Sequence, residues 1–226
     1  AIVDGDWGFG QVTMSHAVDV GLEKAGKSGL AAIAVRKANH IGRLGSYVDH
    51  IAQQGMIGLL FVNAVGTPGY RMAPWGGTEP RLVTDPIAFG IPHSSGNAIV
   101  MDMTSTVVAE GKVRVKRNRG EETPDGWLLD SNGVPTNDPN LLYGDPPGSI
   151  LPLGGMTAGH KGYGLSFMVE VFSGLLTGLG FGLDPLARHN DGCFITVYNV
   201  EHFRPLSDFK KEVKEFAEFV KTSPPA

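Results

Sequence analysis

The fold is decided by the stretch AAIAVRKANHIGRLGSYVDHIAQQGMIGLLFV, residues 31–62. It opens with an apolar run at 31–35 that predicts a buried strand, and a polar stop follows that run. Apolar residues then recur with helical spacing over residues 44–54, where Gly55 ends the predicted helix. A second apolar run at 57–62 predicts another strand. This strand–loop–helix–strand unit indicates a layered α/β domain.

The rest of the chain continues the same alternation on both sides. Further strands are predicted at residues 86–91, 98–103 and 194–200. Further helices are predicted at residues 11–27, 104–117, 162–176 and 207–221. Thr104 or Ser105 would cap the second of these helices, and the third is apolar enough that we expect it to be largely buried. Residues 121–152, rich in Pro, Gly, Asn and Asp, predict a long ordered loop anchored by Trp127.

Composition narrows the class of protein. With 42% hydrophobic and 19% charged residues, the chain is expected to bury an ordinary globular core. Its net charge of −4 argues against nucleic acid or an anionic membrane surface as a partner. No apolar run reaches the roughly 20 residues of a membrane helix. The single cysteine, Cys193, adjoins an apolar strand and is expected in the core; a chain without disulfides fits a reducing compartment, so we expect the cytoplasm.

Several reaction classes find no support in the motifs. The histidines lack metal-ligand spacing and no H-E-x-x-H motif occurs, so we expect no metal site. The chain also lacks a G-x-S-x-G elbow, a phosphate-binding P-loop and the Rossmann G-x-G-x-x-G fingerprint.

Three segments combine glycine or hydroxyl residues with ionisable ones. Residues 39–45 follow a strand and open a helix, where free N–H groups favour a phosphate that Arg43 could pair with. Residues 100–105 end a strand in Asp102 and two hydroxyls, which suits hydrogen bonding to a ribose or an amide. Residues 154–164 set a histidine beside a lysine among glycines, and here a ligand-binding loop is expected. The structural alternatives are a capped helix with a solvated arginine, an ordinary helix cap, and tight turns.

These segments belong to a longer series of motifs in a fixed order. They are NHIG (39–42), GG (76–77), TDPIAFGIP (84–92), MDMTS (101–105), EGKV (110–113), PDGW (124–127), PTNDP (135–139), LPLGG (151–155) and GHKGYGL (159–165). Together they resemble the malate/L-lactate dehydrogenase family of non-Rossmann oxidoreductases, and the resemblance covers essentially the whole chain.

The resemblance implies a three-layer α/β/α fold with a mixed sheet, and a set of site residues. The cofactor-binding positions it implies are His40, Ile41, Gly42, Arg43, Leu44, Asp102, Met103, Thr104, His160 and Lys161. Thr84 and Lys112 fall at substrate-binding positions, although some relatives have a carboxylate in place of Lys112. Asp85 stands where the family usually has Asn.

The resemblance also implies a helical region before this one, with a Ser-His-Gly motif whose histidine transfers the proton, and a C-terminal cofactor loop. Neither is found in the sequence. The only Ser-His pair, Ser15-His16, is followed by Ala17 and so does not match the motif. We therefore expect residues 1–226 to be the central NAD(P)-binding region of a larger chain, with His40 as a weak substitute for the catalytic histidine.

The function implied is hydride transfer between NAD or NADP and a small 2-oxo or 2-hydroxy acid, by a homodimer. Two alternatives stay open at this point. One is a catalytically incomplete relative that binds a dinucleotide, and the other is an interaction module whose glycine segments serve packing alone.

Overall fold

The computed structural model describes residues 1–65, 71–181 and 190–225. The chain forms two compact units, each assembled from separate stretches of sequence. The first unit consists of Ala1–Leu60, Ala88–Asp102 and Phe194–Ala226, and the second of Phe61–Ile87 and Met103–Cys193.

The first unit is built on a six-stranded sheet with the strand order β1-β2-β9-β3-β4-β5. The strands are β1 (Ile2–Asp4), β2 (Leu30–Ala38), β9 (Asn190–Asn199), β3 (Met56–Val65), β4 (Ile87–Ile91) and β5 (Ile99–Met103). β1 and β2 are parallel, with Ile2 opposite Ala34. A strand from late in the sequence thus separates β2 from β3, which is not the Rossmann order.

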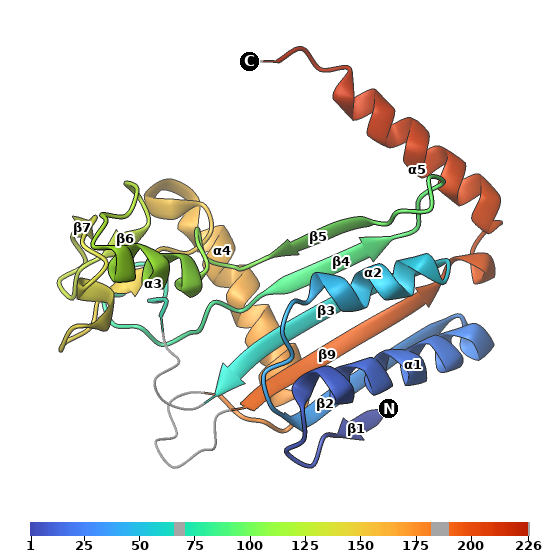
Figure 1. The fold of residues 1–226 in the computed structure, drawn as a ribbon, viewed down its shortest axis with the longest axis horizontal. Helices are drawn as coiled ribbons and strands as arrows, with labels where there is room; N and C mark the ends of the chain where they lie inside the picture. Colours follow the sequence, from blue (N-terminus) through green and yellow to red (C-terminus); the bar gives the residue numbers. More distant parts are fainter. Residues whose placement is uncertain (66–70, 182–189, 226) are drawn as a thin grey trace. The chain divides into compact units, whose positions relative to one another are not determined.

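Three helices accompany this sheet: α1 (Gly10–Ser28), α2 (Gly45–Gln53) and α5 (Leu206–Lys221). α1 and α2 contact each other and lie over the same face of the sheet in Figure 1. α1 buries Met14, Ala17 and Val18 because these residues share one face at helical spacing. α5 is amphipathic, as predicted, but none of its residues is buried.

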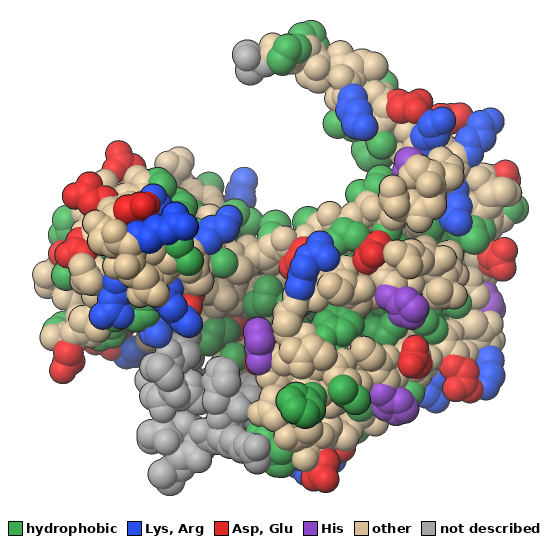
Figure 2. Space-filling view, viewed as in Figure 1, with side chains coloured by type: hydrophobic (Ala, Val, Ile, Leu, Met, Phe, Trp, Pro, Cys, Tyr) green, Lys and Arg blue, Asp and Glu red, His purple; other side chains and the backbone are tan. Residues whose placement is uncertain are grey.

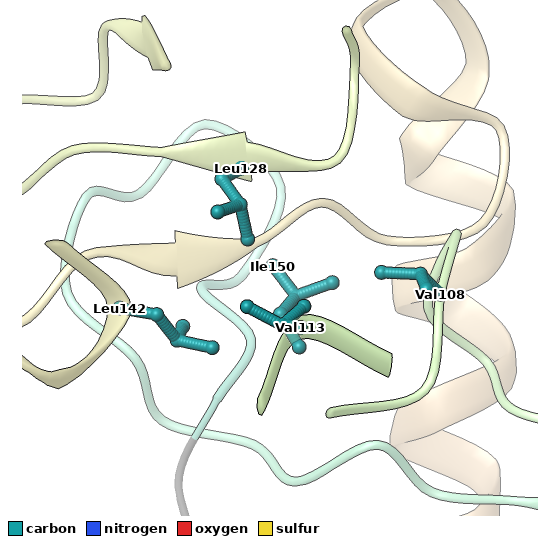
Figure 3. Packing of buried hydrophobic residues seen from close by; sticks show 5 residues of the cluster. All are labelled: Val108, Val113, Leu128, Leu142 and Ile150. Atoms are coloured by element: carbon teal, nitrogen blue, oxygen red, sulfur yellow. The ribbon is translucent and has the colours of Figure 1, made fainter. Parts of the chain in front are cut away.

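The described parts of the second unit include a small antiparallel sheet and the α-helices α3 and α4. The sheet has the order β7-β6-β8, formed by Pro135–Thr136, Leu128–Leu129 and Ser149–Ile150. Five buried residues form a hydrophobic cluster in this unit: Val108, Val113, Leu128, Leu142 and Ile150. Figure 3 shows these side chains converging from different elements. The expected long loop at 121–152 is therefore an ordered segment that carries three short strands and the 3₁₀ turn Leu141–Tyr143, and Trp127 packs against this cluster as an anchor.

Two helix predictions need correction in this unit. The helix predicted from Thr104 begins only at Glu110 and runs to Arg119 as α3. The segment before it is irregular and bent, because β-branched residues crowd a helix and the hydroxyls donate to backbone carbonyls instead. Thr104 Oγ1 donates to Thr106 O at 3.1 Å, and Thr106 Oγ1 donates to Val108 O at 2.7 Å.

The helix predicted from Gly162 begins earlier, at Gly155. It runs as α4 to Val169 and continues as a π-helix over Glu170–Leu175. The expectation that this helix is largely buried was wrong, because Phe167, Met168 and Leu176 are all more than half exposed. The other predicted elements agree with the structure to within a few residues, and the mixed α/β class is confirmed.

None of the helices in the described parts of the chain has both the length and the apolar character needed to cross a bilayer.

Candidate functional site

In the first unit, hydrogen bonds from two side chains fix the segment 39–44. The Asn39 side chain donates to Trp7 O at 2.7 Å and to Gly8 O at 2.9 Å. The Tyr47 hydroxyl donates to Ile41 O from the following helix. Ile41 and Leu44 are buried, whereas His40 and Arg43 are exposed. The loop therefore anchors itself through apolar residues and presents its ionisable ones to the surface.

Asp102, at the end of β5, reaches the beginning of α2. Its Oδ2 accepts a hydrogen bond from Gly45 N at 2.7 Å and lies 3.8 Å from Arg43 Nε. We predicted that a phosphate would bind the free N–H groups at this helix N-terminus. At Gly45 the carboxylate of Asp102 already accepts the hydrogen bond, so the protein itself supplies the anion there. The structure brings together the first two predicted segments, which lie 57 residues apart in the sequence.

In the second unit, Thr84 is fixed through its backbone. Its carbonyl accepts hydrogen bonds from Ser105 N at 2.9 Å and from Ser105 Oγ at 3.0 Å. Met103 and Thr104, both half-buried, precede Ser105 directly. These contacts place Thr84 beside the predicted positions 103 and 104.

His160 and Lys161 lie within α4 and not in a loop. The helix begins after Gly154, whose φ of 101° is accessible to glycine, and is kinked at Ala158. Both side chains are exposed on the turn after the kink. The His160 ring meets the Trp75 ring edge-on, with centroids 6.0 Å apart.

Lys112 lies on α3. It is one of five basic residues on that helix, the others being Arg114, Lys116, Arg117 and Arg119. Figure 2 shows Lys and Arg side chains over this part of the second unit. No hydrogen bond or ion pair between Lys112 and Thr84 is found among the described residues.

Sequence reasoning overlooked a buried pair of acids in the second unit. Asp85 is fully buried and accepts a hydrogen bond from Ser166 Oγ, while Glu170 Oε2 accepts one from Asn63 Nδ2 at 2.8 Å. The two carboxyl groups are near enough for the charge of Glu170 to act on Asp85. Burial, and then the neighbouring Glu170 carboxylate, raises the pKa of Asp85 well above its ordinary value; burial also raises the pKa of Glu170. An acid within the apolar run FMVEVF (167–172) was the signal that could have revealed it.

Cys193 is fully buried, as expected of a core residue. Burial, reinforced by Asp191, raises the pKa of its thiol well above the usual value, which disfavours a nucleophilic thiolate. Within the described ranges, no group of three or more His, Cys, Asp or Glu side chains is arranged to hold a metal ion.

The family model described as malate/L-lactate dehydrogenase matches residues 1–226. The chain is 40% identical to a malate dehydrogenase of Pyrococcus abyssi, over 99% of this chain and 62% of that protein. It is 35% identical to the L-sulfolactate dehydrogenase of Methanothermobacter thermautotrophicus, over 99% of this chain and 64% of that protein. The chain thus spans less than two thirds of the length of these relatives.

Solved structures agree with the sequence comparisons. The sulfolactate dehydrogenase from Methanocaldococcus jannaschii superposes with a TM-score of 0.84 at 34% identity, covering 100% of this chain and 64% of that one. Similarity of this extent, in both sequence and fold, establishes common descent. The chain therefore belongs to the malate/L-lactate dehydrogenase family.

Proposed function

We propose that this chain serves an oxidoreductase that transfers a hydride between NAD or NADP and a small 2-oxo or 2-hydroxy acid. The observation that carries the proposal is the family match over all 226 residues, together with relatives named for malate and sulfolactate. The nicotinamide cofactor supplies the hydride when bound, and the protein orients the reactants.

The surroundings of Asp102 fit a cofactor. The Arg43 side chain is 66% exposed although it faces Asp102, so its guanidinium retains the surface needed to meet a phosphate. Asp102 fixes the loop through Gly45 N, which preorganises the segment His40 to Leu44 for binding. In the second unit, Lys161 offers a second exposed cation beside His160. Each unit thus offers, within itself, an exposed cation of the kind that binds a phosphate.

The roles on the substrate side are proposals of the same kind. Thr84 and Lys112 would contact the 2-oxo acid, and His40 would be the proton donor, because histidine most often carries protons near neutral pH. The alternative is a catalytically incomplete relative that binds the dinucleotide. That alternative predicts cofactor binding without turnover.

Titration with NADH and NADPH tests the proposal. We expect binding of at least one cofactor, and Lys161→Ala should weaken it roughly tenfold by removing a charge-assisted contact. Lys24→Ala is the matched control, since Lys24 is an exposed lysine on α1. Turnover is then assayed with malate, lactate and sulfolactate. Binding without turnover of any acid would favour the incomplete relative, and no binding of either cofactor would contradict both readings.

We also infer a homodimer in the cytoplasm and regard residues 1–226 as the central cofactor-binding region of a longer family chain. Sedimentation velocity should give twice the mass of one chain; the mass of a single chain would refute the dimer.

A further inference from the structure

The second unit contains a cavity that none of the site residues above accounts for. Its volume is about 360 Å³, within the range of small-molecule sites. Residues 73–78 form one side, the turn at 132–133 and Leu129 another, and Ser149–Pro152 the third, with Met156 of α4 completing the wall. The lining thus joins segments up to about eighty residues apart, which sequence patterns could not reveal.

The chemistry of the lining excludes charged ligands. No residue lining the cavity bears a charge. A phosphate or the carboxylate of a 2-oxo acid would need a cation or a cluster of donors there, because an uncompensated anion is costly to bury. The lining is instead mostly apolar and includes the exposed side chains of Trp75 (39%) and Met156 (54%). Such a surface favours an uncharged, planar ring, which can stack on an indole and a thioether.

One polar group in the lining has no partner. Ser149 is fully buried in β8, and its Oγ makes no hydrogen bond with any described residue. Its backbone is occupied by pairing with Leu129 of β6, so the hydroxyl alone is unsatisfied. Buried hydroxyls are normally hydrogen-bonded, and exceptions call for an explanation. A ligand that brings a polar substituent to this end of the cavity would supply the missing bond.

Trp75 connects the cavity to the proposed cofactor residues. Its ring lines the cavity and also meets His160, the neighbour of Lys161. Gly159 makes this approach possible, because a Cβ there would lie 2.5 Å from the Trp75 ring. A ring bound against Trp75 would therefore lie close to the cation proposed to bind a phosphate of the same molecule.

We propose that this cavity is a subsite for an uncharged, planar nitrogen-containing ring with a hydrogen-bonding substituent, stacked on Trp75 and bonded to Ser149. The inference rests on the proposed function in one respect, that the ring comes from the nicotinamide cofactor. That cofactor carries two rings of this chemistry, adenine and the reduced nicotinamide. Either can present a polar group, an exocyclic amine or a carboxamide, to Ser149.

The test uses the 226-residue chain and saturation-transfer NMR with two probes, adenosine and reduced nicotinamide mononucleotide. We expect one probe to bind, which identifies the ring. Ser149→Ala removes the hydroxyl with little change in side-chain volume, and it should weaken that probe and the intact cofactor about tenfold. Trp75→Leu should weaken both at least tenfold. Trp127→Leu is the matched control, because Trp127 packs on the core and does not line the cavity, and it should leave both affinities unchanged.

The outcomes separate this inference from the proposed function. If NADH or NADPH binds the Ser149 and Trp75 variants as tightly as the wild type, the subsite is refuted while the oxidoreductase stands. If neither cofactor binds the wild type but a probe does, with dependence on Ser149 and Trp75, the proposed function fails and the ring site stands. If no probe and no cofactor binds, both are overturned. Thermal unfolding of each variant shows whether a loss of binding reflects a loss of fold.

Discussion

Asp85 and Glu170 place two acidic groups in an interior where one negative charge is already expensive. Asp85 also has a φ of 37°, immediately before Pro86, a conformation that few residues adopt there. Its Oδ1 finds no partner among the described residues. Two neighbouring buried carboxyl groups cannot both ionise without a large cost, so the folded chain favours a pair that keeps a proton. Because Asp85 follows Thr84 directly, its protonation state bears on the position of a proposed substrate residue.

Asp85→Asn should make stability less dependent on pH. The pKa values of the pair are raised in the folded chain, so the stability they contribute is complete below the ordinary carboxyl pKa and is lost as pH rises through the raised values. An asparagine keeps its amide protons throughout. We expect the free energy of unfolding of the variant to be higher than that of the wild type by about 1 kcal/mol or more at pH 9. A difference of one pKa unit between the folded and unfolded states contributes about this much.

Urea unfolding at pH 5, 7 and 9 measures this difference, with the exposed Asp19→Asn as control. Parallel stability curves for the Asp85 variant and the wild type would show that the pair does not hold a proton.

Asp102 acts as a cap supplied from a distant strand. Asp102→Ala removes the acceptor of Gly45 N and the partner of Arg43, and should destabilise the chain by about 0.5–2 kcal/mol. Asp102→Asn keeps an acceptor oxygen and should lose less. Urea unfolding gives the free energies, and amide exchange at Gly45 reports the cap directly. Unchanged exchange at Gly45 in the alanine variant would contradict this role.

At the scale of elements, the sequence patterns succeeded where a single face decides the structure. The segment 31–62 forms β2, α2 and β3 because its apolar periods match those elements without competition. They failed at α4, where the density of glycine suggested a loop. Those glycines serve close packing: Gly159 admits Trp75, and Gly162 lies against the backbone of Leu153. Periodicity cannot distinguish a glycine needed for contact from one needed for a turn.

The sequence predicted the segments that carry the candidate site, but not the contacts between them. The motif order identified the first and second segments, but the bond between Asp102 and Gly45 depends on the pairing of distant strands. The Asp85–Glu170 pair and the Ser149 cavity likewise depend on contacts between residues far apart in the sequence. A local pattern such as the acid within FMVEVF (167–172) can indicate a buried carboxyl group but not its partner, so structure was needed to find these contacts.

Two glycines of α4 should respond to the same substitution with opposite signs. A Cβ on Gly162 would lie 2.3 Å from Leu153 N, a backbone atom that cannot move aside, so Gly162→Ala should destabilise by about 1–3 kcal/mol. A Cβ on Gly164 meets nothing within 4 Å, and alanine favours a helix, so Gly164→Ala should stabilise by up to about 1 kcal/mol. Urea unfolding of both variants decides the matter; effects of equal sign would show that α4 does not pack in this way.

At the scale of the whole molecule, the two units divide the proposed site residues between them. His40, Arg43 and Asp102 belong to the first unit, and Thr84 and Lys161 to the second. The strand β9 contains residues assigned to both units, because the boundary between the units falls between Cys193 and Phe194. In the sheet, β9 lies between β2 and β3. Loss of β9 would remove an interior strand of the main sheet.

Cys193 on β9 should report unfolding of the whole chain. The thiol is fully buried on an interior strand, and its raised pKa leaves little thiolate, so a reagent can reach it only when the sheet opens. We expect a thiol reagent to label the native protein at under about 1% of the unfolded rate, with labelling at equilibrium rising in urea at the midpoint seen by circular dichroism. Cys193→Ser gives the blank, and Ser15→Cys in that background, at an exposed position on α1, gives the rate of an accessible thiol. Bound cofactor should slow labelling of Cys193 but not of the thiol at position 15, because only the former waits for unfolding. Labelling of Cys193 well below the urea midpoint would instead show that β9 opens on its own.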